Sequence, residues 1–294
     1  MFLSDKWKDY ELLDASDGEK LERWNDIVLV RPDPQIVWTV DDADKCPKWK
    51  KSDARYNRSN TGGGKWQTYR KLPEAWTVSY RELKFGIKPM GFKHTGLFPE
   101  QAANWDWFSD IIKSSGRPEN SVNVLNLFAY TGGATMAASA AGAKVCHVDA
   151  AKGMVTWAKE NAVLSGLSDR PIRYIVDDVK KFVAREIRRG HKYDGIIMDP
   201  PSYGRGPGGE VWKIENELFG LIELCTQVLS DDPLFFLVNS YTTGMSGSVM
   251  KNIYKLTLDK KFSGTVDIDE VGLPITNGGL VLPCGYSARW QRRE

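Results

Sequence analysis

The sequence predicts an α/β protein with a doubly wound sheet of seven mostly parallel strands, preceded by a small β-rich subdomain. Two patterns support this fold class. After residue 120, five apolar strand-like runs alternate with helical runs, and two further strand-like runs end the chain. Before residue 86, short strand-like runs are interrupted by Pro-Asp-Pro and Gly-Gly-Gly. We therefore divide the chain into a β-rich N-terminal subdomain, 1–85, and a main α/β domain, 86–294.

Five short runs rich in β-branched and aromatic residues are predicted as the strands of the N-terminal subdomain. They cover residues 10–13, 26–30, 35–40, 66–72 and 76–87. A helix is predicted next, over residues 99–115. Pro99 suits its first turn, where a missing N–H costs nothing, and Arg117 and Pro118 end it.

The main domain alternates strand and helix in a regular order. Apolar strands are predicted over residues 123–130, 144–150, 172–178, 193–201 and 234–240, and helices over 134–143, 152–166, 179–190, 214–230 and 247–258. Because each strand is followed by a helix, the strands should be parallel, with helices covering both faces of the sheet. Residues 264–273 and 279–290 adjoin Asn277-Gly278-Gly279 and predict an antiparallel hairpin that closes the sheet.

Composition and cysteine spacing exclude several classes of protein. The chain has 294 residues, of which 41% are hydrophobic and 27% charged, as in a globular protein of one large or two unequal domains. Its cysteines, Cys46, Cys146, Cys225 and Cys284, lie far apart, so neither a zinc cluster nor a disulfide framework is expected. No apolar stretch reaches the roughly 18 residues of a membrane span. We therefore expect a cytoplasmic protein that binds no metal.

One segment concentrates positive charge, although the net charge of the chain is only +2. Between residues 48 and 71, eight basic residues accompany a single acidic one, Asp53, with four aromatic residues among them. This basic segment, expected to be a loop, suits contacts with RNA phosphates and stacking on unpaired bases. A solvated loop with a few buried aromatic residues explains the same pattern equally well.

Features suited to a bound nucleoside end three consecutive strands. Gly132 and Gly133 follow the first strand, Asp149 ends the second, 17 residues after Gly132, and Asp177-Asp178 end the third. The glycines let a ligand approach the backbone, and a carboxylate at this spacing can bind ribose hydroxyls. A full G-x-G-x-x-G is absent, which disfavours a dinucleotide. Each feature alone is more often structural, as in a helix N-cap, but together they predict a nucleoside without a pyrophosphate.

Five runs, GFKHTGLFPEQ, LNLFAYTGG, VDA, VDDV and MDPPSYG, resemble class I S-adenosylmethionine (SAM)-dependent methyltransferases, in the family that includes the 23S ribosomal RNA cytosine and guanine methyltransferases. The similarity covers about 200 of 294 residues and implies a Rossmann-like methyltransferase fold with SAM as the cofactor. Residues 1–80 do not match the RNA-binding domain of that family. By resemblance, eight residues would contact SAM: Tyr130, Thr131 and Gly132 at the methionine part, Asp149 at the ribose, Asp178 and Val179 at the adenine, and Phe98 and Gln101 over the cofactor.

The fourth strand ends in the run Asp199-Pro200-Pro201-Ser202-Tyr203-Gly204. Its prolines stiffen the backbone and leave carbonyl oxygens without local N–H competitors. An exocyclic amine could donate its two N–H bonds to Asp199 and the Pro200 carbonyl, while Tyr203 stacks on the base. In classical amino methyltransferases the aromatic residue follows the second proline directly, whereas here Ser202 intervenes. The structural alternative is a Pro-Pro that ends a buried strand, with Asp199 capping a helix.

Methylation at carbon 5 of cytosine needs a cysteine thiolate that attacks carbon 6. Neither the Asp-Pro-Pro run nor the fifth-strand segment, 237–242, contains a cysteine. Cys225 lies in an apolar helix and is expected to pack in the core. Cys284 in the last strand is expected to be structural, although it could approach the site. An exocyclic amine is therefore favoured over carbon 5.

The leading hypothesis is a SAM-dependent methyltransferase that acts on a base of ribosomal RNA, with RNA as its partner. Two alternatives remain: methylation of a protein or small molecule, and a SAM-binding or RNA-binding module without activity. The glycine-rich run 203–209 is either a lid over the acceptor or a plain surface turn. His147 is expected to be a core residue of its strand rather than a ligand.

Overall fold

The computed structural model describes residues 1–59, 63–205, 211–242 and 244–293. The chain forms two compact units. The first contains Met1, Asn104–Glu270 and Gly285–Glu294, and the second contains Phe2–Ala103 and Val271–Cys284. The second unit therefore combines the N-terminal region with a C-terminal stretch that no sequence pattern linked to it.

Seven strands of an eight-stranded sheet follow one another in the order β16-β17-β15-β12-β9-β10-β11. Its parallel strands are β9 (Asn123–Leu127), β10 (Lys144–Asp149), β11 (Ile172–Val176), β12 (Gly195–Met198) and β15 (Phe235–Ser240). β17 (Val281–Arg292) pairs antiparallel with β15, and β16 (Gly264–Pro274) lies beyond it. The predicted doubly wound, mostly parallel sheet is confirmed. An unpredicted short strand, β1 (Phe2–Leu3), pairs with the part of β16 that belongs to the second unit.

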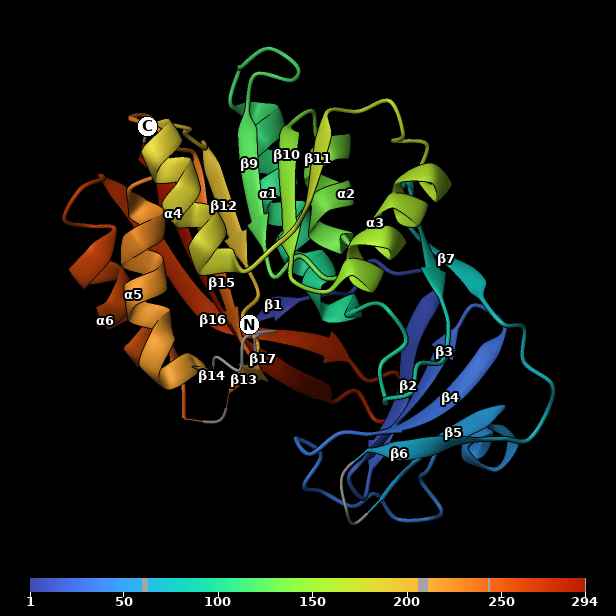
Figure 1. The fold of residues 1–294 in the computed structure, drawn as a ribbon. Helices are drawn as coiled ribbons and strands as arrows, with labels where there is room; N and C mark the ends of the chain where they lie inside the picture. The colour runs from blue at the N-terminus through green and yellow to red at the C-terminus, as the bar shows by residue number, and fades with distance from the viewer. Residues whose placement is uncertain (60–62, 206–210, 243, 294) are drawn as a thin grey trace. The chain divides into compact units, whose positions relative to one another are not determined.

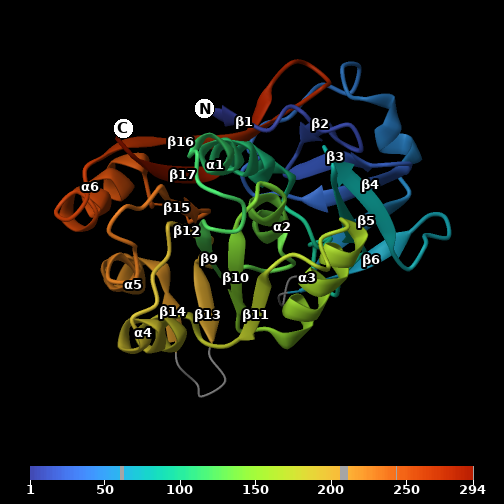
Figure 2. The ribbon, with the colours of Figure 1, turned by 90° about the horizontal axis from the view of Figure 1, so that it is seen from above.

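Helices cover both faces of this sheet, as the alternation predicts. Figures 1 and 2 show α1 (Ala102–Ser114), α2 (Gly133–Ala140) and α3 (Lys152–Leu164) on one face, and α4 (Val179–Arg189), α5 (Ile214–Thr226) and α6 (Gly247–Thr257) on the other. The predicted helix at Pro99 begins with a 3-10 turn, η2 (Pro99–Gln101), before α1. Local signals set the ends of α4, because Asp178 Oδ1 accepts the Lys181 N–H at 2.9 Å and Gly190 adopts a φ of 69°.

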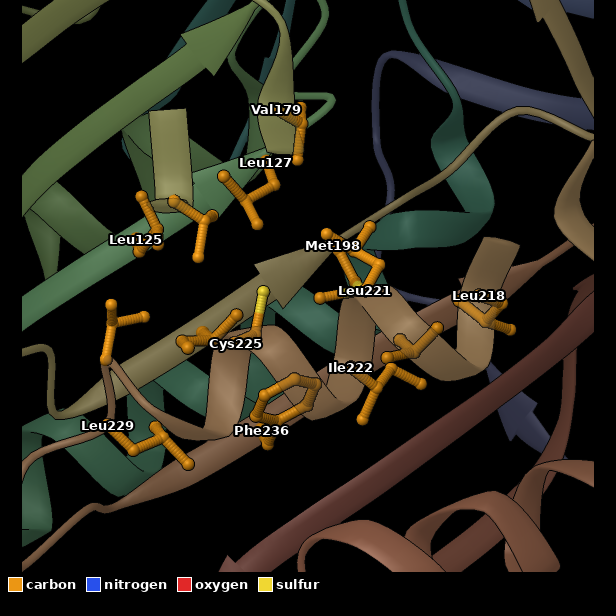
Figure 3. Packing of buried hydrophobic residues seen from close by; sticks show 14 of the residues in the cluster. Leu125, Leu127, Val179, Met198, Leu218, Leu221, Ile222, Cys225, Leu229 and Phe236 are labelled. Atoms are coloured by element: carbon orange, nitrogen blue, oxygen red, sulfur yellow. The ribbon is translucent and has the colours of Figure 1, made fainter. Parts of the chain in front are cut away.

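The largest hydrophobic core lies between the sheet and helices α4, α5 and α6. Figure 3 shows Leu125 and Leu127 of β9 and Met198 of β12 turned toward the side chains of α5, among them Leu221 and Cys225. All residues of β12 and β15 are buried, which explains the apolar runs over most of their length; β15 ends in the buried polar residues Asn239 and Ser240. Cys225 is fully buried, so its expected role in core packing is confirmed.

The second unit contains a five-stranded sheet in the order β2-β3-β4-β5-β6. Its strands are β2 (Tyr10–Ser16), β3 (Glu19–Trp24), β4 (Ile27–Pro32), β5 (Ala54–Arg58) and β6 (Gly64–Thr68). Neighbouring strands are antiparallel except for the parallel pair β4 and β5. A separate hairpin joins β7 (Trp76–Tyr80) and β8 (Leu83–Ile87). The prediction that the N-terminal region is rich in β-strands is thus confirmed.

Three strand assignments in this region need correction. Residues 35–40, predicted as a strand, pair with no strand, and isolated hydrogen bonds hold them, such as that from Trp38 Nε1–H to the Ala15 carbonyl at 2.9 Å. Two strands were missed: β3, whose charged residues conceal its alternation, and β5, which lies in the basic segment. Glu22 in β3 is buried because its carboxylate accepts hydrogen bonds from Arg31 at 2.8 Å and from the Tyr10 hydroxyl at 2.8 Å.

The basic segment, 48–71, is not a loop. It contains most of the 3-10 helix η1 (Pro47–Lys51) and the antiparallel strands β5 and β6. Tyr56 and Trp66 face each other across these strands with ring centroids 5.5 Å apart. Such cross-strand aromatic pairs stabilise a hairpin, so two of the aromatic residues in this segment are structural.

Within the described ranges, no helix is both long and apolar enough to cross a bilayer. The four cysteines carry free thiols. In the same part of the chain, no three His, Cys, Asp or Glu side chains are grouped as metal ligands would be.

Candidate functional site

The chain between β9 and α2, residues 128–133, forms a strained turn at the carboxyl end of the sheet. Phe128 and Tyr130 have φ values of 54° and 50°, in the left-handed region that non-glycine residues rarely adopt. The turn is held by a hydrogen bond from the Gly132 N–H to the Ala129 carbonyl at 3.0 Å, and by one from Asn161 Nδ2 of α3 to the Thr131 carbonyl at 2.8 Å. Such strain is typical of functional sites, where surrounding contacts offset its cost.

Both glycines of this β9 turn are required by close packing. Gly132 has a φ of 86°, and a Cβ atom there would lie 3.0 Å from Ala158 Cβ of α3. A Cβ on Gly133 would lie 2.6 Å from the Trp105 ring of α1. The Gly-Gly pair therefore lets the turn contact α1 and α3, a structural role that accompanies any role in ligand binding.

We predict that Gly132→Ala lowers the free energy of unfolding by about 1–3 kcal/mol, because alanine disfavours the left-handed conformation and its methyl group crowds Ala158. Urea denaturation measures this change. Gly153→Ala in α3 is the matched control, since no atom lies within 4 Å of its Cβ position and helical alanine is favoured. Equal stability of the two variants would contradict the strain assigned to the β9 turn.

Asp149, at the end of β10, is tied directly to the β9 turn. Its Oδ2 accepts the Tyr130 N–H at 2.8 Å, and its Oδ1 accepts the Ala151 N–H at 2.8 Å. Burial raises the pKa of this carboxyl above its usual value, and the two backbone N–H groups oppose that shift. Each oxygen has a further lone pair for a ligand hydroxyl. The structure thus brings Tyr130 and Asp149 together.

The third predicted element, Asp177-Asp178, lies beside Asp149, since the Asp177 N–H donates to the Asp149 carbonyl at 3.1 Å. Asp178 is exposed and forms the N-cap of α4, while Val179 is buried at the start of the same helix. The structural alternative named for a strand-end aspartate therefore applies to Asp178. Its contact with an adenine stays a prediction, as do the contacts of the other seven residues.

Asp199 follows β12 and lies next to β9, because its N–H is 3.4 Å from the Leu127 carbonyl. The Asp-Pro-Pro loop, residues 199–202, is held from outside. Trp212 Nε1–H donates to the Pro201 carbonyl at 2.6 Å, and the Ile214 N–H donates to the Ser202 carbonyl at 3.1 Å. The loop thus starts at the same edge of the sheet as the β9 turn and Asp149.

Tyr203 belongs to a short hairpin rather than to a free loop. It begins β13 (Tyr203–Arg205), which pairs antiparallel with β14 (Val211–Lys213), and it is 51% exposed. Tyr203 is thus half exposed at the surface of the first unit. Residues 206–209 of the run expected to be a lid or a turn lie outside the described residues.

Phe98 and Gln101 belong to the second unit. Phe98 is the N-cap of η2, with its ring 5.3 Å from the His94 ring, and Gln101 is buried at the end of η2. Cys284 also lies in this unit and is buried. Burial raises the pKa of its thiol well above the usual value, so Cys284 stays protonated and suits a structural role.

Buried polar contacts beneath the site were not predicted from the sequence. At the end of β15, Asn239 Oδ1 accepts hydrogen bonds from Asn104 Nδ2 at 3.0 Å and from the Ser287 hydroxyl at 2.6 Å. Arg289 Nε donates to Asn104 Oδ1 at 2.8 Å, and burial lowers the pKa of this guanidinium to about 10. His147 behaves as the expected core residue, because it is fully buried with Nδ1 2.9 Å from the Thr135 hydroxyl.

Comparison with known proteins places this geometry in a wider context. A family model described as S-adenosylmethionine-dependent methyltransferase matches residues 35–217. Over 200 residues the chain is 30% identical to a ribosomal RNA large subunit methyltransferase K/L of Shewanella frigidimarina, a match covering 65% of this chain and 27% of that protein. The chain therefore spans about a quarter of the length of this relative.

Solved structures match nearly the whole chain. The crystal structure of a SAM-dependent methyltransferase from Agrobacterium tumefaciens superposes with a TM-score of 0.90 at 36% identity, covering 99% of this chain and 93% of that one. A structure from Streptococcus mutans, described as that of a SAM-dependent methyltransferase, has a TM-score of 0.75 at 18% identity and covers 97% and 76% of the two chains. The second likeness concerns the fold alone.

Proposed function

This chain belongs to the S-adenosylmethionine-dependent methyltransferase family, and from that premise we propose that it methylates an exocyclic amine of a ribosomal RNA base. The observation that supports this proposal most directly is the Asp-Pro-Pro loop beside the carboxyl end of β9. A loop of this kind offers hydrogen-bond acceptors and no N–H groups of its own at the two prolines. A ribosomal RNA substrate would place the enzyme's action in the cytoplasm.

The residues of the first unit fit SAM. Asp149 is a half-buried carboxylate whose two oxygens already accept backbone N–H groups and retain lone pairs for ribose hydroxyls. Gly132 presents bare backbone in the β9 turn, where Tyr130 and Thr131 would line the methionine part. Asp178 and Val179 would meet the adenine, whereas the contacts of Phe98 and Gln101, which belong to the second unit, stay a prediction from the resemblance alone. When bound, SAM supplies an electrophilic methyl group on a sulfonium.

The carbonyl oxygens of the Asp-Pro-Pro loop differ in whether another residue of the protein donates a hydrogen bond to them. The Pro201 and Ser202 carbonyls are engaged by Trp212 and Ile214. Within the described residues, this leaves the Pro200 carbonyl, next to Asp199, for the acceptor. The two N–H groups of an exocyclic amine would donate to the Asp199 carboxylate and the Pro200 carbonyl, which turns the nitrogen lone pair toward the methyl group. The Asp199 carboxylate orients the amine and takes its proton only as positive charge develops.

The exposure of Tyr203 supports a base as the acceptor, and the burial of the thiols favours an exocyclic amine over carbon 5 of cytosine. Tyr203, half exposed, would stack on a base flipped out of its stem, which offsets part of the few kcal/mol that flipping costs. Carbon-5 chemistry requires a thiolate. Both Cys225 and Cys284 are buried, and burial raises the pKa of each thiol, so neither supplies that nucleophile.

Support for RNA comes from the relatives and from the charge of the second unit. The curated relative is named as a ribosomal RNA methyltransferase. Two cations of the basic segment are paired, Arg55 with Glu19 and Arg70 with Asp53. Residues 1–85 would then form an RNA-binding subdomain that contacts phosphates through cations. Besides Arg70, the exposed cations of the described part of the segment are Lys48, Lys50, Lys51, Arg58, Lys65 and Lys71.

Mass spectrometry of nucleosides tests this proposal. Ribosomal RNA from a strain lacking the gene should lose one N-methylated base, and the wild-type gene should restore it. The purified protein should also transfer a radiolabelled methyl group from SAM to RNA from the deletion strain and not to RNA from the wild type. An unchanged nucleoside profile, with no transfer to the unmethylated RNA, would reject ribosomal RNA as the substrate and leave a protein or small molecule as the acceptor.

A further inference from the structure

Trp212, on β14, contacts three parts of the proposed active site. Its indole N–H donates to the Pro201 carbonyl at 2.6 Å. Its ring centroid lies 5.3 Å from that of Phe128 in the β9 turn, with the ring planes inclined by 54°. Lys180 Nζ, near the start of α4, lies 5.9 Å from the same indole centroid. One side chain thus connects the β9 turn, α4 and the Asp-Pro-Pro loop, all within the first unit.

The Asp-Pro-Pro loop depends on donors from outside itself. Pro200 and Pro201 have no N–H groups, so neither can donate a backbone hydrogen bond that would hold the loop. Trp212 therefore holds the carbonyl two residues after Asp199, and Ile214 holds the next one. The Ser202 hydroxyl is also 2.6 Å from the Thr242 hydroxyl. Of these contacts, only that of Trp212 also reaches the β9 turn, through the Phe128 ring.

We propose that Trp212 is a positioning residue that fixes Asp199 and the Pro200 carbonyl relative to the cofactor turn. Its N–H is used by Pro201 and its ring packs against Phe128, so it acts on the loop rather than on the base. Stacking on the base is left to Tyr203. An orientation error of about 1 Å in the acceptor lowers the rate strongly without a matching loss of binding. This inference rests on the proposed role of Asp199.

Trp212→Phe tests the proposal, because phenylalanine keeps an aromatic ring beside Phe128 and removes the N–H. Loss of one hydrogen bond should lower kcat about fivefold to tenfold, while the KM for RNA and the Kd for SAM each change less than about twofold. Hydrogen–deuterium exchange should be faster at the amides of residues 202–204. Trp38→Phe is the matched control for kcat and for exchange, since it removes an indole hydrogen bond to a backbone carbonyl in the second unit and should change neither kcat nor exchange at residues 202–204.

Two results would overturn the proposal: a wild-type kcat in Trp212→Phe, or a decrease that Trp38→Phe shows equally. If the wild-type enzyme transfers no methyl group to ribosomal RNA, the proposed function fails instead. Exchange at residues 202–204 then still decides the role of Trp212, and unchanged exchange rejects it. If Trp212→Phe does not fold, benzothienylalanine at this position keeps the bicyclic shape and removes only the N–H donor, and the same measurements apply.

Discussion

Asp199→Ala should lower kcat roughly 100-fold or more and leave the Kd for SAM nearly unchanged, because the carboxylate is assigned to the transition state of the acceptor amine. The lone pair of an exocyclic amine is delocalised into the base. An acceptor that binds one N–H bond more tightly as positive charge develops stabilises the transition state more than the ground state. A loss confined to kcat is the result expected for such a group.

Asp199→Asn refines this measurement. The asparagine oxygen can still accept one N–H bond, but it carries no charge and cannot take the proton. Its kcat should therefore lie between those of the wild type and the alanine variant. Asp231→Ala, at an exposed position of the first unit, is the control and should leave kcat at the wild-type value. Turnover by Asp199→Ala at the wild-type rate would reject the amine mechanism while leaving the SAM-binding site intact.

Elements whose environment is set by the sheet could be predicted from the sequence. β12 and the first four residues of β15 are buried and carry no polar side chain, so both strands could be assigned from the sequence. Where ion pairs are buried, the hydropathy pattern of the sequence hides the strand. Glu22 and Arg31 neutralise each other inside the second unit, so β3 reads as polar although it is a central strand. Residues 35–40 show the opposite case, a β-type run that pairs with no strand.

The same distinction decides which site residues could be predicted from the sequence. Asp149 could be predicted because its position at the end of a parallel strand follows from chain order alone. Trp212 and Asn161 could not, because their hydrogen bonds to the site depend on how side chains of separate elements pack together and not on the order of the strands. A motif alone does not decide the role of Asp178. This aspartate resembles an adenine ligand, but its Oδ1 also accepts the Lys181 N–H at 2.9 Å and so caps α4.

Asp149→Ala should raise the Kd for SAM roughly 100-fold or more, since hydrogen bonds to a charged group contribute about 1.5–3 kcal/mol each and two ribose hydroxyls are involved. The substitution also removes hydrogen bonds within the protein. Tyr130 and Ala151 would lose the acceptors of their N–H groups, at 2.8 Å in both cases. The β9 turn, already strained at Tyr130, would lose one of the contacts that hold it.

Asp149→Asn should raise the Kd for SAM nearly as much. A site that needs only a polar group would instead tolerate asparagine. Both carboxylate oxygens accept backbone N–H groups, so either orientation of the amide points its NH₂ at a donor. Asp178→Ala is the comparison: loss of the α4 N-cap should cost about 0.5–2 kcal/mol of stability. Titration calorimetry with SAM and thermal denaturation of all three variants distinguish these effects. An Asp149→Asn variant with wild-type affinity would remove the ribose assignment.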